Sequence, residues 1–150
     1  MTTERMSIED YRLLLSRGGL RSAPKRKTEE EDLHRACIEL AERMEWKNPI
    51  LQWLFHCPSG GLRAKGEGGK LKAMGTKKGY PDLTLHHESG PWRGFACELK
   101  SSTGRLSAEQ KGWLAMFESQ RYLVCVHRTL EGFQADLLRF LSSMDNPSPS

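Results

Sequence analysis

The sequence lacks the long apolar stretches that mark membrane and secreted proteins. No apolar run approaches the length of a membrane span, and the N-terminus, Met-Thr-Thr-Glu-Arg, lacks the apolar region of a signal peptide. No glycine loop of nucleotide-binding spacing leads from a strand into a helix, which disfavours a nucleotide phosphohydrolase. We therefore expect a cytoplasmic protein with no membrane partner.

Cysteine is scarce, and no two cysteines lie close together in the chain. The four residues are widely spaced, each within an apolar segment, and no Cys-x-x-Cys pair occurs. This pattern fits neither a disulfide framework nor the close pairs of a zinc site, so it favours buried free thiols. The five histidines show no metalloprotease spacing. The residues are Cys37, Cys57, Cys97 and Cys125, with His34, His56, His86, His87 and His127.

Hydrophobic and aromatic residues are few but sufficient for one core. With 150 residues, 37% hydrophobic and 8% aromatic, the chain is long enough for one α/β domain but not for two. Its net charge of +4 is unevenly distributed: residues 1–27 carry seven Lys/Arg against three acids, and residues 60–80 carry six against one. Two basic segments beside an acidic remainder indicate a polyanionic substrate laid across a metal site, or basic loops that only aid solubility.

The domain is expected to occupy residues 28–144. Residues 1–27 are predicted to form a basic arm, either partly flexible or a short helix, because Gly and Pro interrupt the segment. Residues 145–150 are rich in Pro and Ser and are predicted to form a disordered tail.

Two short predicted strands between residues 79 and 100 carry acidic residues among apolar ones. Asp82 opens the first strand directly after Pro81, and Glu98 and Lys100 lie two apart on the second, so they share a face. Buried strands disfavour such side chains, so their presence needs a reason. Two carboxylates and an ammonium at a sheet edge form a site for a hard divalent cation. The alternative is a surface hairpin with a solvated Glu–Lys pair.

A helix is predicted over residues 28–44. Thr28 and Glu31 form a capping box, and a buried apolar stripe follows at helical spacing. Glu30 projects to the side of that stripe, whereas Glu31 projects away near its margin. Glu30 is therefore a candidate third carboxylate of the cation site, or only a first-turn acid that favours the helix dipole. The stripe comprises Leu33, Ala36, Cys37, Leu40, Ala41 and Met44.

The segment between this helix and the hairpin combines an apolar stretch with a glycine turn. Residues 50–57 are predicted to form a buried strand that runs into Pro-Ser-Gly-Gly. Backbone amides of that turn, with His56 and Arg63, either contact a phosphate or form a plain turn. Residues 64–75 are predicted to form a short basic helix, weakened by Glu-Gly-Gly, with Ala64, Leu71, Ala73 and Met74 inward.

The C-terminal half alternates helix and strand. Ser107 is predicted to cap a helix over residues 108–120, followed by an interior strand over residues 122–127 and a closing helix over residues 130–144. This order predicts a small mixed sheet with helices on both faces. The closing helix is expected to turn Phe133, Leu137, Leu138, Phe140 and Leu141 inward.

Four linked motifs resemble the virus-type replication-repair nuclease (VRR-NUC) domain of the PD-(D/E)XK nuclease superfamily. They are His-x-Pro-Ser-Gly-Gly-x-Arg, Lys-x-Gly-Tyr-Pro-Asp-Leu, Gly-x-x-x-Glu-Leu-Lys and Gly-Arg-Leu-Ser-x-Glu-Gln, in this order over about residues 28–142. The resemblance implies an α/β fold with a restriction-endonuclease-like core. It also implies Mg²⁺- or Mn²⁺-dependent, structure-directed cleavage of DNA in replication and repair intermediates, as in small bacterial and phage members. Some of these resemble dimeric Holliday-junction resolvases.

The resemblance also assigns roles to residues. It makes Asp82 and Glu98 metal ligands and Lys100 the group that orients water or neutralises charge. Gln110 supports the site, and the ligand from the first helix is Glu30 or Glu31, of which the facing argument favours Glu30. Ser59 departs from the Asn of many members. The alternative is a non-catalytic DNA-binding module of the same fold. The expected DNA partners include branched and flap structures. The residues expected to contact the DNA are His56, Ser59, Arg63, Lys65, Lys70, Lys72, Lys77, Lys78 and Arg105.

Overall fold

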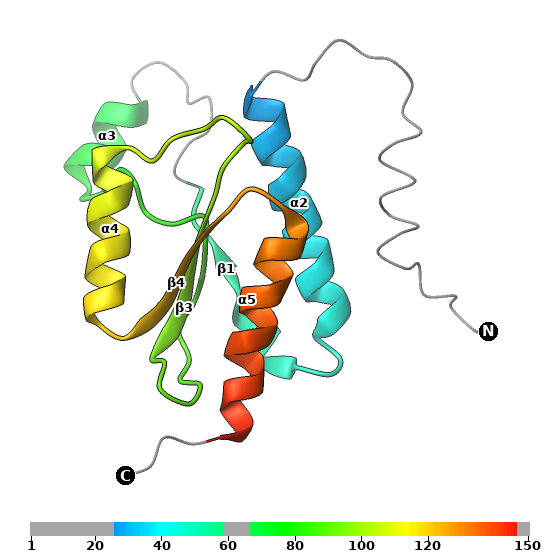
Figure 1. Cartoon of the computed structure of the whole chain (residues 1–150). Helices are drawn as coiled ribbons and strands as arrows, with labels where there is room; N and C mark the ends of the chain where they lie inside the picture. Colours follow the sequence, from blue (N-terminus) through cyan, green and yellow to red (C-terminus); the bar gives the residue numbers. More distant parts are fainter. Residues whose placement is uncertain (1–25, 59–66, 147–150) are drawn as a thin grey trace, which may run out of the picture.

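A four-stranded mixed sheet forms the centre of the fold (Figure 1). The computed structural model describes residues 26–58 and 67–146. Along the sheet, the first and second strands pair antiparallel, the second and third pair antiparallel, and the third and fourth pair parallel. The predicted small mixed sheet is therefore confirmed. In sheet order the strands are β1 (Phe55–His56), β2 (Leu83–Leu85), β3 (Gly94–Leu99) and β4 (Tyr122–His127).

Helices cover both faces of this sheet (Figure 1). Helices α2 (Arg26–Met44) and α5 (Leu130–Ser142) pack against each other and lie on one face, and α4 (Ala108–Ser119) lies on the other. Strands β3 and β4 are parallel, so their connection must cross over, and α4 provides the crossover. The N-terminus of α4 therefore lies at the end of the sheet where β3 ends. The remaining helices are α3 (Glu67–Ala73) and the 3₁₀ helices η1 (Pro49–Trp53) and η2 (Ser143–Asp145).

The hydrophobic core lies between the sheet and the pair of helices α2 and α5. Phe95 of β3 contacts the rings of Phe133 and Phe140 of α5, with ring centroids 6.1 and 5.7 Å apart. All three rings are fully buried, and burial of side chains of this size dominates the stability of a domain. Other members are Cys37, Leu51, Leu83, Leu85, Cys97, Leu99, Leu123, Cys125, Leu137 and Leu141. The prediction of buried free thiols is thus confirmed for three cysteines, while Cys57 is half-buried.

The predicted strand over residues 50–57 is wrong in most of its length. Pro49 occupies the first turn of η1, because its fixed φ suits a helical start, and only Leu51 of that helix is buried. Trp53 and Phe55, whose apolar character suggested burial, are 67% and 53% exposed. The strand is reduced to Phe55–His56. Similarly, β4 has the predicted bounds but lies at the end of the sheet order and not in the interior.

Several helix details also differ from the prediction. Helix α2 begins at Arg26, so Thr28 lies within the helix and not at its N-cap. Helix α3 includes the glycines expected to interrupt it, and Met74, expected inward, is 72% exposed. Leu138 of α5 is 47% exposed, although its four predicted partners are buried. Ser59, Arg63, Ala64 and Lys65, and the predicted N-terminal short helix, lie outside the described residues. No helix in the described ranges is long and apolar enough to cross a membrane.

Candidate active site

Asp82 and β3 are joined by a hydrogen bond. Asp82 directly precedes β2, and Pro81 before it is buried. The backbone N–H of Leu99 donates to Asp82 Oδ2 at 2.8 Å. This bond fixes the carboxylate beside the end of β3 and occupies one of its oxygens, which leaves Oδ1 for another partner.

Glu98 is a buried carboxylate held by two donors. It is 2% exposed, and its Oε1 lies 3.0 Å from Lys100 Nζ and accepts a 2.6 Å hydrogen bond from Gln110 Nε2. The prediction that Glu98 and Lys100 share a face is therefore confirmed. Lys100 is itself only 7% exposed, so the alternative of a solvated surface pair is wrong.

The electrostatics of Glu98 follow from this burial. Burial raises the pKa of Glu98 to about 7, and the negative charge of Asp82 adds to the rise. Lys100 opposes the shift through its hydrogen bond and charge, and Glu30 contributes a smaller rise. The carboxylates thus repel one another across the site. A cation placed among them relieves that repulsion, because it favours the ionised form of each group.

Gln110 joins the capping of α4 to the site. Ser107 Oγ accepts from the Gln110 N–H, and Gln110 Oε1 accepts from the Ser107 N–H, so the predicted N-cap at Ser107 is confirmed as a full capping box. The Gln110 amide nitrogen remains free of the cap and donates to Glu98. One side chain therefore fixes the helix start and orients the buried carboxylate.

The first turns of α2 supply further carboxylates. Glu30 Oε1 accepts from the backbone N–H of Ser101 at 3.1 Å, and Glu29 Oε1 accepts from Ser102 at 2.8 Å. These bonds tie α2 to the loop that follows β3. Glu30 and Glu31 both line the same cleft as Asp82, but Glu30 accepts from Ser101 just after β3 and raises the pKa of Glu98.

The cleft has room for a ligand between these groups. Its volume is about 700 Å³, and its lining includes Asp82, Glu98, Lys100 and Gln110 together with the acids of α2. Ser101 Oγ is buried and has no hydrogen-bond partner. A Cβ at Gly104 would lie 2.9 Å from Ser101 Oγ and 3.0 Å from Glu30 Oε1, so a larger residue at this position would crowd the contact between Glu30 and Ser101. The carboxylates that line the cleft, Glu30, Asp82 and Glu98, supply the hard oxygens that fit a hydrated Mg²⁺ or Mn²⁺ ion.

Two histidines lie against this cleft. His56 Nδ1 is 3.0 Å from the carbonyl oxygen of Asp82, and its ring packs edge-on against His34, with centroids 4.1 Å apart. Burial, with the neighbouring His56, lowers the pKa of His34, which favours the uncharged ring. His34 was not among the predicted site residues. The available signal was its position four residues after Glu30, which places the two on one helix face.

Most described residues that were predicted to contact DNA point to solvent beside the cleft. Lys70 and Lys72 belong to α3, while Lys77 and Lys78 follow it and lead to Gly79. Trp113 of α4 donates its indole N–H to the Lys78 carbonyl at 2.8 Å, which holds this basic segment near α4. Arg105 is exposed in the loop before α4. Among the predicted residues that the structure describes, the cleft lining includes only His56.

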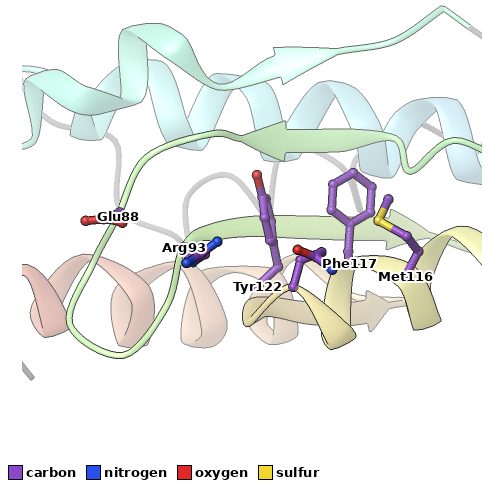
Figure 2. Close-up of a pocket in the computed structure, with 6 residues that line it drawn as sticks. Glu88, Arg93, Met116, Phe117 and Tyr122 are labelled. Atoms are coloured by element: carbon purple, nitrogen blue, oxygen red, sulfur yellow. The ribbon is translucent and has the colours of Figure 1, made fainter.

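A second hollow lies at the other end of the sheet (Figure 2). It measures about 340 Å³. Glu88 and Arg93 flank it from the turn between β2 and β3, and Tyr122 rises from the start of β4. The Tyr122 hydroxyl lies 2.8 Å from His86 Nδ1. This hollow has one carboxylate and an arginine, so it does not reproduce the acidic cluster. Its other lining residues are Met116, Phe117 and Gln120.

The mixed sheet, the crossover helix and the carboxylates at the end of β3 define a nuclease-like α/β domain. The model of the VRR-NUC domain family matches residues 28–129, and the chain belongs to this family of nuclease-type domains. A solved structure described as a VRR_NUC domain protein has a TM-score of 0.68 and is 20% identical. The match covers 87% of this chain and 96% of that one, and it supports the fold alone. Among curated proteins, none matches the chain.

Proposed function

We propose that this chain is a divalent-metal-dependent endonuclease that hydrolyses phosphodiester bonds in branched or flap DNA of replication and repair. The observation that carries the proposal is the buried Glu98, held 3.0 Å from Lys100 at the cleft that Asp82 also lines. A buried carboxylate and a buried ammonium destabilise a fold unless they are well compensated, so the presence of both in the cleft calls for a function. Family membership supplies the reaction class.

Asp82, Glu98 and Glu30 would hold the cation, Mg²⁺ or Mn²⁺. When bound, such an ion lowers the pKa of water and stabilises the leaving oxygen of a phosphodiester. Lys100 places positive charge beside the cleft, where the phosphate gains negative charge in the transition state. Gln110 keeps Glu98 in position, and the exposed lysines of residues 70–78 contact the DNA backbone.

The test is cleavage of labelled DNA. We expect the purified chain to cut a four-way junction or a flap faster than linear duplex with Mg²⁺ or Mn²⁺, and not at all with EDTA. Asp82→Ala should abolish cutting but leave salt-sensitive DNA binding, because that binding depends on Lys and Arg. Glu88→Ala, an exposed carboxylate at the opposite end of the sheet, is the matched control and should cut normally.

Two results would contradict the proposal. Continued cutting by Asp82→Ala, with or without added metal, would show that the assigned site is wrong. Salt-sensitive binding of DNA by the wild-type protein without any metal-dependent cutting would indicate the non-catalytic DNA-binding module instead.

A homodimer in the cytoplasm of a bacterial or phage-infected cell completes the proposal. A four-way junction has two-fold symmetry, and two copies of one site would suit it. Light scattering of the chain with and without junction DNA measures this directly. A monomer that cuts junctions would remove the dimer from the account and leave the metal site intact.

A further inference from the structure

A second cluster of metal-ligating side chains lies outside the acidic cleft. Cys125 and His127 lie two apart on β4, and Asp136 lies on α5. One ligand atom from each lies within 4.8 Å of the other two. Because the parallel register pairs Cys97 with Cys125 and Leu99 with His127, the cluster faces the α2 and α5 side of the sheet. Glu98 points to the other face.

The geometry points to a binding site for a borderline-soft divalent cation, of which Zn²⁺ is the type, held by Cys125, His127 and Asp136. Thiolate, imidazole and carboxylate together are a typical zinc donor set, whereas Mg²⁺ prefers oxygen alone. Bond lengths of about 2.0–2.3 Å to zinc place ligand atoms roughly 3.3–3.7 Å apart. The His127 and Asp136 atoms, 2.7 Å apart, would therefore have to separate slightly to bind one ion, while all three ligand atoms already lie within 4.8 Å of one another. Water can take the fourth position, as it does in open zinc sites.

The surroundings of the three ligands leave them able to bind. The Cys125 thiol donates a long bond of 3.8 Å to the Ala96 carbonyl. His127 Nε2 and Asp136 Oδ2 are 2.7 Å apart, and their side chains are 17% and 26% exposed, which gives an ion access from solvent. Arg139 Nη1 lies 3.7 Å from Asp136 Oδ1, but its side chain is 60% exposed and can move away.

Gly132 makes room for the imidazole. A Cβ at this position would lie 2.5 Å from His127 Nδ1, so any other residue would displace the ring. Glycine costs stability in a helix, and here close approach to the ring accounts for it. The site would clamp α5 to β4 directly behind Lys100, whose N–H donates to the His127 carbonyl at 2.9 Å.

Co²⁺ is the probe that tests the site, because a bound thiolate gives an intense charge-transfer band. Titration of the full chain with CoCl₂ should produce that band, Zn²⁺ should displace it, and millimolar Mg²⁺ should not. Cys125→Ser should abolish it. Gly132→Ala retains all three ligands and should weaken Co²⁺ affinity about 10- to 100-fold, as changes around metal ligands do.

Matched variants separate this site from the acidic cleft. Cys57→Ser and Glu98→Ala alter residues that line the cleft and should keep the band. Circular dichroism of the metal-free variants checks that each is folded. Absence of a thiolate band in the wild-type chain, or its persistence in folded Cys125→Ser, would overturn the inference. Neither result bears on DNA cleavage, so the proposed function is tested separately.

Discussion

The two faces of β3 are equally buried and chemically opposite. Leu99 and Glu98 are both 2% exposed, yet Leu99 joins the apolar core and Glu98 faces a carboxylate, an amide and an ammonium. Burial of a leucine side chain stabilises a fold by about 1.5–3 kcal/mol. Burial of the carboxylate instead raises its pKa to about 7, with Asp82 adding to the rise. One face therefore maintains the fold, and the other holds groups that the fold alone would not select.

The largest change in stability is expected from the apolar face. Phe140→Ala removes a fully buried ring that contacts Phe95, and should lower the free energy of unfolding by about 3–5 kcal/mol. Denaturant unfolding measures this change. Leu138→Ala on the same helix is the control and should cost less than about 1 kcal/mol, because that side chain is 47% exposed. Equal losses in the two variants would contradict the position of the core.

The largest change in activity is expected from the polar face. Lys100→Met keeps the length of the side chain but removes the charge, and should lower the rate of DNA cleavage about 10²–10³-fold. Single-turnover cleavage with saturating Mg²⁺ measures this rate. Lys111→Met, on the exposed surface of α4, should cut as the wild type does. If the Lys100 variant also cut normally, the two faces would not differ in function as described.

A smaller change in stability, in this case a gain, is expected for Asp82→Asn. In the metal-free protein the folded Glu98 pKa of about 7 exceeds its ordinary value of 4.5, so stability falls as pH rises between these values. Removal of the Asp82 charge should restore about 1 kcal/mol at pH 8 and nothing at pH 5, where Glu98 is protonated. Thermal unfolding in EDTA at the two pH values measures the gain. A variant less stable than wild type at pH 8 would show that these carboxylates do not repel.

The smallest expected effect is a shift in the pH dependence of cleavage when Gln110 is changed. Gln110→Glu retains a group that can accept from the Ser107 N–H. It also adds a further carboxylate beside Glu98, in place of the amide that donates to it. Wild-type cleavage at limiting Mg²⁺ should rise with pH to a plateau above about 7, because Glu98 must lose its proton to bind a cation. In the variant, the pH at which cleavage rises should be higher by about half a pH unit. Gln120→Glu, at the other end of α4, should leave the profile in place.

Local spacing was enough to predict much of the candidate site. The two-residue separation of Glu98 and Lys100 placed both on one face, and the Ser107 N-cap placed the start of α4 correctly. Both features depend on geometry within one strand or one turn. The order of helices and strands predicted the small mixed sheet, which the structure confirms. The four linked motifs predicted the family, which the family model confirms.

Features that depend on contacts between distant segments could not be predicted in this way. Residues 50–57 are apolar enough for a strand, but Pro49 and the edge position of β1 leave Trp53 and Phe55 exposed. The cluster of Cys125, His127 and Asp136 depends on how α5 packs on β4, and no spacing within the sequence specifies that packing. The spacing rules that disfavoured a zinc site apply to cysteines or to histidines that lie close together in the chain, and not to a mixed set of ligands from a strand and a helix.

The most direct test of the central claim is a crystal grown with Mn²⁺ and examined by anomalous scattering. We expect a peak at the acidic cleft, within coordination distance of the carboxylates of Asp82 and Glu98 and beside Glu30. A fully ordered cleft without that peak, at a Mn²⁺ concentration that supports cleavage, would contradict the claim that the polar face of β3 exists to hold a cation.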